Sequence, residues 1–323
     1  MMSSDETRDG VSLTNLDQPL FEEADATKRD LVDYLDAVRD RILPQLRGRP
    51  LSVVRTVRGQ APFMQKNLPK YAPSWIESVS MWAEASRREV AYAICNDRRT
   101  LLWFANQRAI EYHVTLVTAE HPDQQTHMVL DIDPPEGDRF DTVVGAARLI
   151  RQALADSGLS GAVKTSGAKG MHIFVPVQGP VPIEDVAAAT RAVAARAERL
   201  DPALATTAYI REDRNGKVFL DSTRAGGATV VAAYSPRVRP GAPVSWPVDW
   251  EHLDDVHPRD FTVRTVAGLI RDGDPWAEQM PHAQRLPVDL IEEGHTIPVA
   301  RVQAMHEGKR RARAARAAAD EPS

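Results

Sequence analysis

The chain has 323 residues, of which 43% are hydrophobic and 26% charged, a composition typical of a globular protein with a full core. No apolar run approaches the roughly 20 residues of a membrane helix, and residues 1–6 lack the basic start and apolar stretch of a secretory signal. A single cysteine excludes internal disulfides and a cysteine-based zinc site, and the net charge of −5 argues against a protein that coats nucleic acid nonspecifically. We therefore expect a cytoplasmic protein, in which a local basic groove is still possible.

In chain order, the sequence predicts a flexible polar arm over residues 1–11, one folded domain over residues 12–298 and a basic tail over residues 299–323. The domain is expected to begin with a helix that Thr27 caps, in which apolar side chains recur at helical spacing up to Ile42 and Pro44 lies near the end. Strands are predicted at 51–57, 90–94, 110–117, 127–133, 162–166, 171–177, 217–221 and 228–233, and further helices at 100–107, 138–155, 183–200 and 261–271. The mixture predicts an α/β fold with helices packed on a sheet.

Two segments lie outside this pattern. The proline-rich stretch 235–247 keeps Val238, Val244 and Trp246 among its prolines, so we expect an ordered, extended crossing rather than a linker. The basic tail carries five cations, either on a solvated helix end or at a contact with nucleic acid or a partner: Lys309, Arg310, Arg311, Arg313 and Arg316.

Four predicted strands alternate apolar with polar residues, which places each set on one face of a sheet. One face is expected to be core. The other is expected to collect His113, Asp131, Asp133, His172 and Asp221.

Asp131 and Asp133 are two residues apart, so their Cα atoms should lie about 7 Å from each other on one side of a strand. Such like charges repel, and a cation between them resolves the repulsion. A third carboxylate, Asp221, would complete the oxygen ligands that Mg²⁺ or Mn²⁺ prefers, and two such ions can catalyse phosphoryl transfer. The alternative is that the two aspartates merely end a strand before the Pro134-Pro135 turn.

The segment TSGAKGMH at 165–172 is predicted to be a glycine-rich turn between two strands. Such turns can direct several backbone N–H groups at one anion, and Lys169 adds a point charge. The spacing is not that of a Walker A loop, and taken alone the segment is better explained as an ordinary tight hairpin with a surface lysine. Basic residues that could neutralise a triphosphate flank Asp221: Arg211, Arg214, Lys217, Arg224, Arg237 and Arg239.

Taken together, four stretches resemble the polymerase domain of bacterial ligase D, in the archaeo-eukaryotic primase-polymerase superfamily. They are LDIDP at 130–134, TSGAKGMH at 165–172, GKVFLD at 216–221 and AYSPR at 233–237. The segments LTN at 13–15 and TK at 27–28 also match the start of that domain, and the resemblance extends from about residue 12 to about residue 280. Each motif is weak alone, but their order and spacing are specific.

This resemblance implies a primase-polymerase core over residues 12–298, with a mixed or antiparallel sheet platform flanked by helices. Asp131, Asp133 and Asp221 would ligate two Mn²⁺ or Mg²⁺ ions and catalyse template-directed nucleotide addition from NTP or dNTP. The implied nucleotide contacts are His113, Ser166, Lys169, Gly170, His172, Arg224 and Arg237. The implied DNA contacts are Asn15, Gln18, Lys28, Arg55, Phe63, Met64 and Lys66.

The resemblance also implies how DNA is held. Phe63 would stack on a template base, and Lys28 would bind the 5′-phosphate on the far side of a gap or break. Lys28 follows the Thr27 cap, so free N–H groups of a first helical turn should add to the attraction for that phosphate. Gln18 replaces a second lysine of the family, Met64 replaces the second residue of a Phe-Phe pair, and Arg224 stands near a position that is often an amide.

The expected function is therefore a DNA repair polymerase that prefers ribonucleotides and extends primers at short gaps or double-strand breaks, in end joining or excision repair. The sequence has no ligase or nuclease segment, so we expect the protein to meet an ATP-dependent DNA ligase as a separate protein. We also expect a monomer that acts at the nucleoid, with Ku as a further partner. A non-catalytic DNA-end module that recruits a ligase remains an alternative, which the three aspartates and Lys169 disfavour. A primase that starts chains without a primer is another, weakened by the absence of cysteine ligands for a zinc module.

Overall fold

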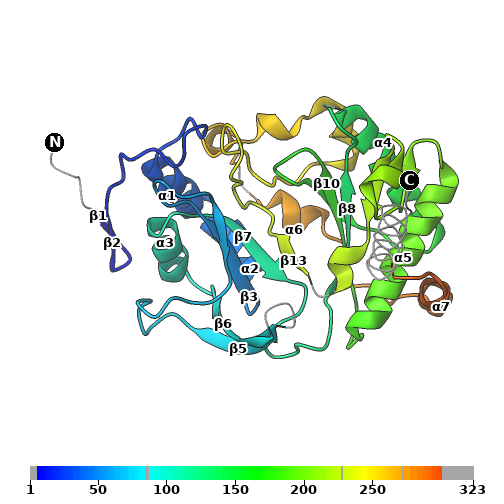
Figure 1. The fold of residues 1–323 in the computed structure, drawn as a ribbon, viewed down its shortest axis with the longest axis horizontal. Coiled ribbons are helices and arrows are strands. Elements are labelled where there is room, and N and C mark those ends of the chain that lie inside the picture. The colour runs from blue at the N-terminus through cyan, green and yellow to red at the C-terminus, as the bar shows by residue number, and fades with distance from the viewer. Residues whose placement is uncertain (1–5, 84–86, 138, 227, 271–272, 300–323) are drawn as a thin grey trace, which may run out of the picture.

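The computed structural model, which describes residues 6–83, 87–137, 139–226, 228–270 and 273–299, contains two β-sheets of five or more strands that lie in different halves of the molecule. Strands β8 and β10 belong to one sheet, and β3, β7 and β13 belong to the other (Figure 1). One continuous cluster of buried apolar side chains links the elements around both sheets. The mixed α/β architecture with largely antiparallel sheets is the one that the sequence predicts.

The first sheet has the strand order β11-β12-β8-β10-β9. Its strands are β8 (His127–Asp133), β9 (Ala162–Thr165), β10 (Met171–Pro176), β11 (Ala205–Thr206) and β12 (Val218–Asp221). Helices α4 (Phe140–Asp156) and α5 (Ile183–Leu200) pack against it, and α7 (Val288–Thr296) packs on α5 (Figure 1). The alanine-rich stripes of α4 and α5 are buried, which lets both helices approach the sheet closely.

The second sheet has the order β13-β7-β3-β6-β5, with β4 paired to β3. Its strands are β3 (Pro50–Arg55), β4 (Phe63–Gln65), β5 (Ser78–Ala83), β6 (Arg88–Ile94), β7 (Ala109–Thr115) and β13 (Thr229–Val231). Helices α1 (Lys28–Ala37), α2 (Arg39–Leu46) and α3 (Arg98–Asn106) lie on its side of the molecule (Figure 1). No helix in the described residues is both long and apolar enough to cross a bilayer.

The proline-rich stretch 235–247 is an ordered crossing between the two sheets, as the sequence predicts. Ser235 Oγ accepts a hydrogen bond from the Tyr112 backbone on β7, at 2.8 Å. At the other end, the Trp246 carbonyl accepts one from the Thr165 backbone on β9, also at 2.8 Å. Val244 and Trp246 are buried, so the crossing is part of the core.

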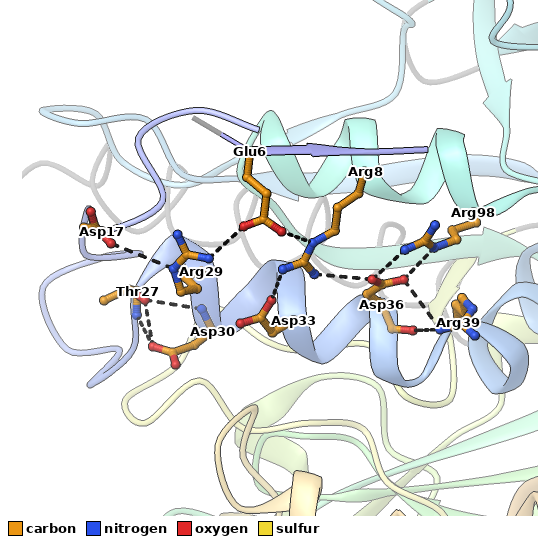
Figure 2. A network of polar contacts seen from close by, with 10 residues as sticks. All are labelled: Glu6, Arg8, Asp17, Thr27, Arg29, Asp30, Asp33, Asp36, Arg39 and Arg98. Carbon is orange, nitrogen blue, oxygen red and sulfur yellow. Dashed lines mark hydrogen bonds and ion pairs between the residues drawn. The ribbon is translucent and has the colours of Figure 1, made fainter. Parts of the chain in front are cut away.

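The N-terminal segment differs from the flexible arm predicted over residues 1–11. Strands β1 (Glu6–Arg8) and β2 (Val11–Leu13) form a hairpin, while residues 1–5 lie outside the described part of the chain. Arg8 pairs with Glu6, with Asp33 at 2.6 Å and with Asp36 at 3.3 Å (Figure 2). Glu6 and Arg8 of the predicted arm therefore belong to an ion-pair network that fastens the hairpin to α1.

The predicted first helix is two helices, which Val38 separates. Leu31, Leu35, Val38 and Ile42 are all buried, so their helical spacing continues across the break and conceals it. Pro44 lies inside α2, two residues before the last residue of that helix, and is therefore near a helix end as the sequence predicts.

The predicted helix at 261–271 is also wrong over the described residues, where the segment contains only the short 3₁₀ turn Val266–Gly268. Phe261 and Val263 instead make backbone hydrogen bonds with the crossing, through Val244 and Ala242. Strand β4 was missed because it is short and largely exposed, and β5 was missed because its alternating residues are only half-buried or exposed. The predicted basic residues of the tail, 309–316, lie outside the described residues.

Candidate active site

Three carboxylates meet where β8 ends. Asp131 stands opposite Asp221 of β12 in the strand register, and Asp133 follows Asp131 on the same side of β8. Asp131 and Asp221 are buried, Asp133 is partly exposed, and one oxygen of each lies within 4.8 Å of the others. The alternation of the sequence thus correctly predicts that these three side chains meet.

The cluster is electrostatically strained. Burial, followed by the charges of Asp131 and Asp221, raises the pKa of Asp133 to about 6. Burial opposes ionisation of Asp131 as well, but His172 and Arg224 outweigh it and lower its pKa. Arg224 Nε lies 3.0 Å from Asp131 Oδ2 and 3.7 Å from Asp221 Oδ2. Three converging carboxylates with only partial neutralisation suit a divalent cation with a preference for oxygen ligands.

The glycine-rich turn between β9 and β10 closes one side of the cluster. A Cβ atom on Gly170 would lie 1.9 Å from the Ile132 carbonyl oxygen of β8, so only glycine fits there. Ser166 Oγ accepts hydrogen bonds from the backbone of Ala168 and of Gly170, at 3.2 Å each. Lys169 is exposed, so it can reach an anion bound beside the turn.

His172 of β10 stands opposite Asp131 in the register. Its Nε2 atom is 3.2 Å from Asp131 Oδ1, and burial lowers the pKa of His172 to about 4. On its other side, Nδ1 contacts Lys164 at 2.8 Å. Lys164 is fully buried, and its position inside a predicted strand gives no sign in the sequence that it belongs to the site.

His113 was predicted to share a sheet face with the aspartates, but it lies on β7 of the other sheet. Alternation gives the face of a strand and does not show to which sheet the strand belongs. His113 Nε2 is 2.8 Å from Glu111 Oε2, and Arg237 Nε is 3.2 Å from the same oxygen. Arg237 also donates to the Ser166 carbonyl, so it joins this pair to the glycine-rich turn.

Glu111 is therefore a second residue that sequence reasoning missed. Its burial by itself would raise its pKa, but the bond from His113 and the charge of Arg237 outweigh burial and lower the pKa to about 2. The ionised carboxylate holds two predicted nucleotide contacts in place. A polar residue alternating with Ile110 and Tyr112 in a buried strand was the available signal.

A cavity of about 460 Å³ adjoins the end of β8. Four cations line it, three of them among the basic candidates of the sequence: Arg139, Arg211, Arg214 and Lys217. Arg211 pairs with Glu136 at 2.8 Å, and Arg214 stacks on Phe219 with its Cζ 3.7 Å from the ring centroid.

The predicted DNA contacts fall into two groups. Arg55, Phe63, Met64 and Lys66 lie on or beside the β3–β4 pair, where Phe63 is 38% and Met64 44% exposed and Lys66 is also exposed. Arg55 Cζ lies 5.9 Å from the Phe63 ring centroid, and Arg55 donates to Gln65 and Tyr71. This group forms an exposed edge with an aromatic ring and cations.

The second group surrounds the start of α1, where Asn15 and Gln18 are exposed and Lys28 is buried. Lys28 Nζ donates to the Thr14 carbonyl at 2.6 Å and to Asn106 Oδ1 at 2.7 Å, and burial lowers its pKa to about 8. The free helix N–H groups expected here are bonded: the backbone N–H of Lys28 and that of Arg29 donate to preceding carbonyls at 2.8 Å each.

Gln18 instead lines a cavity of about 590 Å³ together with Arg108 and Arg58. Arg108 Nη1 lies 3.4 Å from Gln18 Oε1, and its Nη2 donates to the Pro19 carbonyl at 2.7 Å. Sequence reasoning missed Arg108, which follows the helix α3 and gives no motif.

Comparison with known proteins gives concordant results. The family model described as "LigD, primase-polymerase domain" matches residues 27–276. The multifunctional non-homologous end joining DNA repair protein LigD of Mycobacterium tuberculosis is 34% identical over 93% of this chain, and the bifunctional LigD of Bacillus subtilis is 31% identical over 87%. The chain spans 42% and 46% of those two proteins, less than half of each.

Among solved structures, the polymerase domain of Mycobacterium tuberculosis ligase D, determined in complex with DNA, superposes with a TM-score of 0.76. It is 32% identical in sequence, and the match covers 85% of this chain and 99% of that domain. The chain belongs to the LigD primase-polymerase domain family.

Proposed function

We propose that this protein is a metal-dependent nucleotidyltransferase that extends a primer 3′ end along a DNA template at short gaps or double-strand breaks. The observation that carries the proposal is the convergence of Asp131, Asp133 and Asp221 within 4.8 Å, beside a glycine-rich turn. These carboxylates would hold Mn²⁺ or Mg²⁺, which supplies charge stabilisation for in-line attack on the nucleotide's α-phosphate. A fold that only bound DNA ends would have no need to bring three carboxylates together, two of them buried.

The incoming NTP or dNTP would lie between the glycine-rich turn of the first sheet and His113 of the second sheet. Lys169 and the cations near the glycine-rich turn would bind its triphosphate, with Arg237 held by Glu111 for that purpose. His113, anchored by Glu111, would face the sugar. We expect a preference for ribonucleotides, because a buried polar group that loses its 2′-OH partner costs about 1–3 kcal/mol.

DNA would contact both predicted groups. Phe63 would stack on a template base while Arg55 and Lys66 contact the backbone, as aromatic residues beside cations do in other nucleic-acid sites. The 5′-phosphate across the gap would enter the cavity of Gln18 and Arg108. Lys28, whose ammonium is already hydrogen-bonded, would support that cavity through Thr14 and Asn106.

The relatives are named for non-homologous end joining, and we infer a role in that pathway or in excision repair. An ATP-dependent DNA ligase and Ku are the proposed partners of a monomer that acts in the cytoplasm at the nucleoid. The second candidate function is that of a primase, which starts chains without a primer. Synthesis on a template that carries no primer would support this candidate.

The test is extension of a primer on gapped DNA with and without a 5′-phosphate, comparing ribo- and deoxyribonucleotides. We expect metal-dependent extension that is faster with the phosphate and with ribonucleotides. An Arg108→Ala variant should lose most of the phosphate effect, whereas Arg285→Ala, which removes an exposed cation outside this cavity, serves as the control. DNA binding without extension would support the non-catalytic alternative.

A further inference from the structure

An exposed tyrosine lies beside the β3–β4 pair, in the connection from β4 to β5. Tyr71 is 61% exposed, yet its side chain is held at two points. Its hydroxyl accepts a hydrogen bond from Arg55 Nη1 at 2.9 Å, and its ring centroid lies 6.4 Å from that of the buried Trp103. A ring that is held in this way and still open to solvent loses little conformational freedom when a flat ligand stacks on it.

Arg55 joins Tyr71 to the other DNA contacts of the proposed function. Arg55 Cζ lies 5.9 Å from the centroid of the Phe63 ring, so one guanidinium contacts both exposed aromatic side chains. Its Nε donates to the Gln107 carbonyl at 2.9 Å, and the next residue, Arg108, lines the cavity proposed for the 5′-phosphate. Tyr71 therefore lies close both to the residue proposed to stack on a template base and to the part of the chain that lines the phosphate cavity.

The charge of this part of the chain suits a polyanion. Residues 41–76 contain no aspartate or glutamate, although the net charge of the whole chain is −5. Arg58, Lys66 and Lys70 are exposed in this stretch, and Lys70 directly precedes Tyr71. Cations beside exposed aromatic rings are typical of surfaces that bind single-stranded nucleic acid, because phosphates contact the cations while bases stack on the rings.

We propose that Tyr71 is a second stacking platform, which binds the base of an unpaired template nucleotide next to the one on Phe63, with Lys70 at its phosphate. In a gap of one nucleotide the template has no second unpaired base, so this subsite is filled only in longer gaps. Every base has a flat face, so the subsite accepts any of them. The assignment of the bound strand as a template rests on the proposed function, whereas its binding to Tyr71 can be measured without catalysis.

The test combines changes in the protein with changes in the DNA. It measures the affinity of the full-length protein for duplexes with a gap of one or three nucleotides, without nucleotide substrate. Tyr71→Leu should weaken binding to the longer gap by at least about fivefold, the lower end of what loss of one stacked base costs, and should leave binding to the shorter gap unchanged. Removal of the middle unpaired base should weaken binding by the wild type to a similar extent, but should not weaken binding by Tyr71→Leu further.

Two further variants separate the ring from the other groups. Tyr71→Phe keeps the ring and loses only the hydroxyl that contacts Arg55, so it should bind the longer gap like the wild type. Lys70→Gln should reduce the salt dependence of binding to that gap, because one cation fewer then displaces counterions from the DNA. Arg285→Gln, which removes an exposed cation outside this stretch, is the matched control.

Equal losses on both gaps, or no loss in Tyr71→Leu on the longer one, would overturn the proposal. A Tyr71→Phe variant as weak as Tyr71→Leu would also overturn it, because Tyr71 would then act only by supporting Arg55. If base removal weakens Tyr71→Leu as much as the wild type, the base lies elsewhere. A wild type that binds the longer gap through Tyr71 but extends no primer would refute the proposed nucleotidyltransferase function and leave the stacking subsite established.

Discussion

Replacement of Asp133 by asparagine should stabilise the metal-free protein while it abolishes activity. Burial and the charges of Asp131 and Asp221 raise the pKa of Asp133 from 3.8 to about 6. Since each pKa unit corresponds to about 1.4 kcal/mol, the ionised side chain costs roughly 3 kcal/mol of folding free energy at pH 8. Asparagine has nearly the same shape and no charge, so the variant should gain about 2–3 kcal/mol.

The gain has a defined pH dependence. A pKa that is raised on folding favours the native state at low pH, where the carboxyl group is protonated, and this advantage is lost as the pH rises through about 6. The benefit of Asp133→Asn should therefore be full at pH 8, about half as large at pH 5 and mostly absent near pH 4. Urea unfolding in the presence of EDTA at these three pH values measures it.

Asp131→Asn provides the contrast, because Asp131 contacts both His172 and Arg224. These partners hold the pKa of Asp131 low against its burial, so this variant should lose stability at pH 8. If Asp133→Asn is neutral or destabilising at pH 8, or if its effect does not change with pH, the three carboxylates do not repel as described.

Three further predictions concern residues around the site and the N-terminal hairpin. Arg224→Gln should raise the affinity for Mn²⁺ in calorimetry, because the Arg224 guanidinium contacts two of the carboxylates and competes with the metal ion for them. Unchanged or weaker Mn²⁺ binding would show that Arg224 and the metal do not compete. Glu111→Gln should raise the KM for the nucleotide more than the Kd for DNA, because it releases His113 and Arg237, and an unaltered KM in extension assays would contradict that role. Asp36→Ala should cost roughly 1–2 kcal/mol in urea unfolding at low salt and less in 1 M salt, as expected for a partly buried ion-pair network; no loss at low salt would mean that the network does not stabilise the hairpin.

Much of the candidate site could be predicted from the sequence, because alternation in strands is a local property. Asp131 and Asp133 share a face by their spacing alone, and the glycines at 167 and 170 predict a tight turn. The crossing at 235–247 was predictable because its apolar residues have to be buried. Each of these inferences uses residues that are close in the chain.

The missed features depend on contacts between distant segments. Lys164 and Glu111 lie inside predicted strands, and their roles follow from which strand or crossing packs beside them. Lys28 follows a clear cap, yet its ammonium group donates hydrogen bonds to residues 14 and 106. The backbone N–H groups of residues 28 and 29 donate to the carbonyls of residues 18 and 16, and no local sequence pattern shows these bonds. The break at Val38 is concealed because both helices bury the same stripe.

The most direct test of the central claim is extension of a primer across a short gap in DNA by the wild type and by Asp221→Ala, with Mn²⁺ and with EDTA. Asp221 belongs to a different strand from the other two carboxylates, so it tests whether the site assembled across β8 and β12 is the catalytic one. We predict extension by the wild type with the metal, none with EDTA, and none by Asp221→Ala although it still binds the gapped DNA. Extension by Asp221→Ala at the wild-type rate would contradict the account.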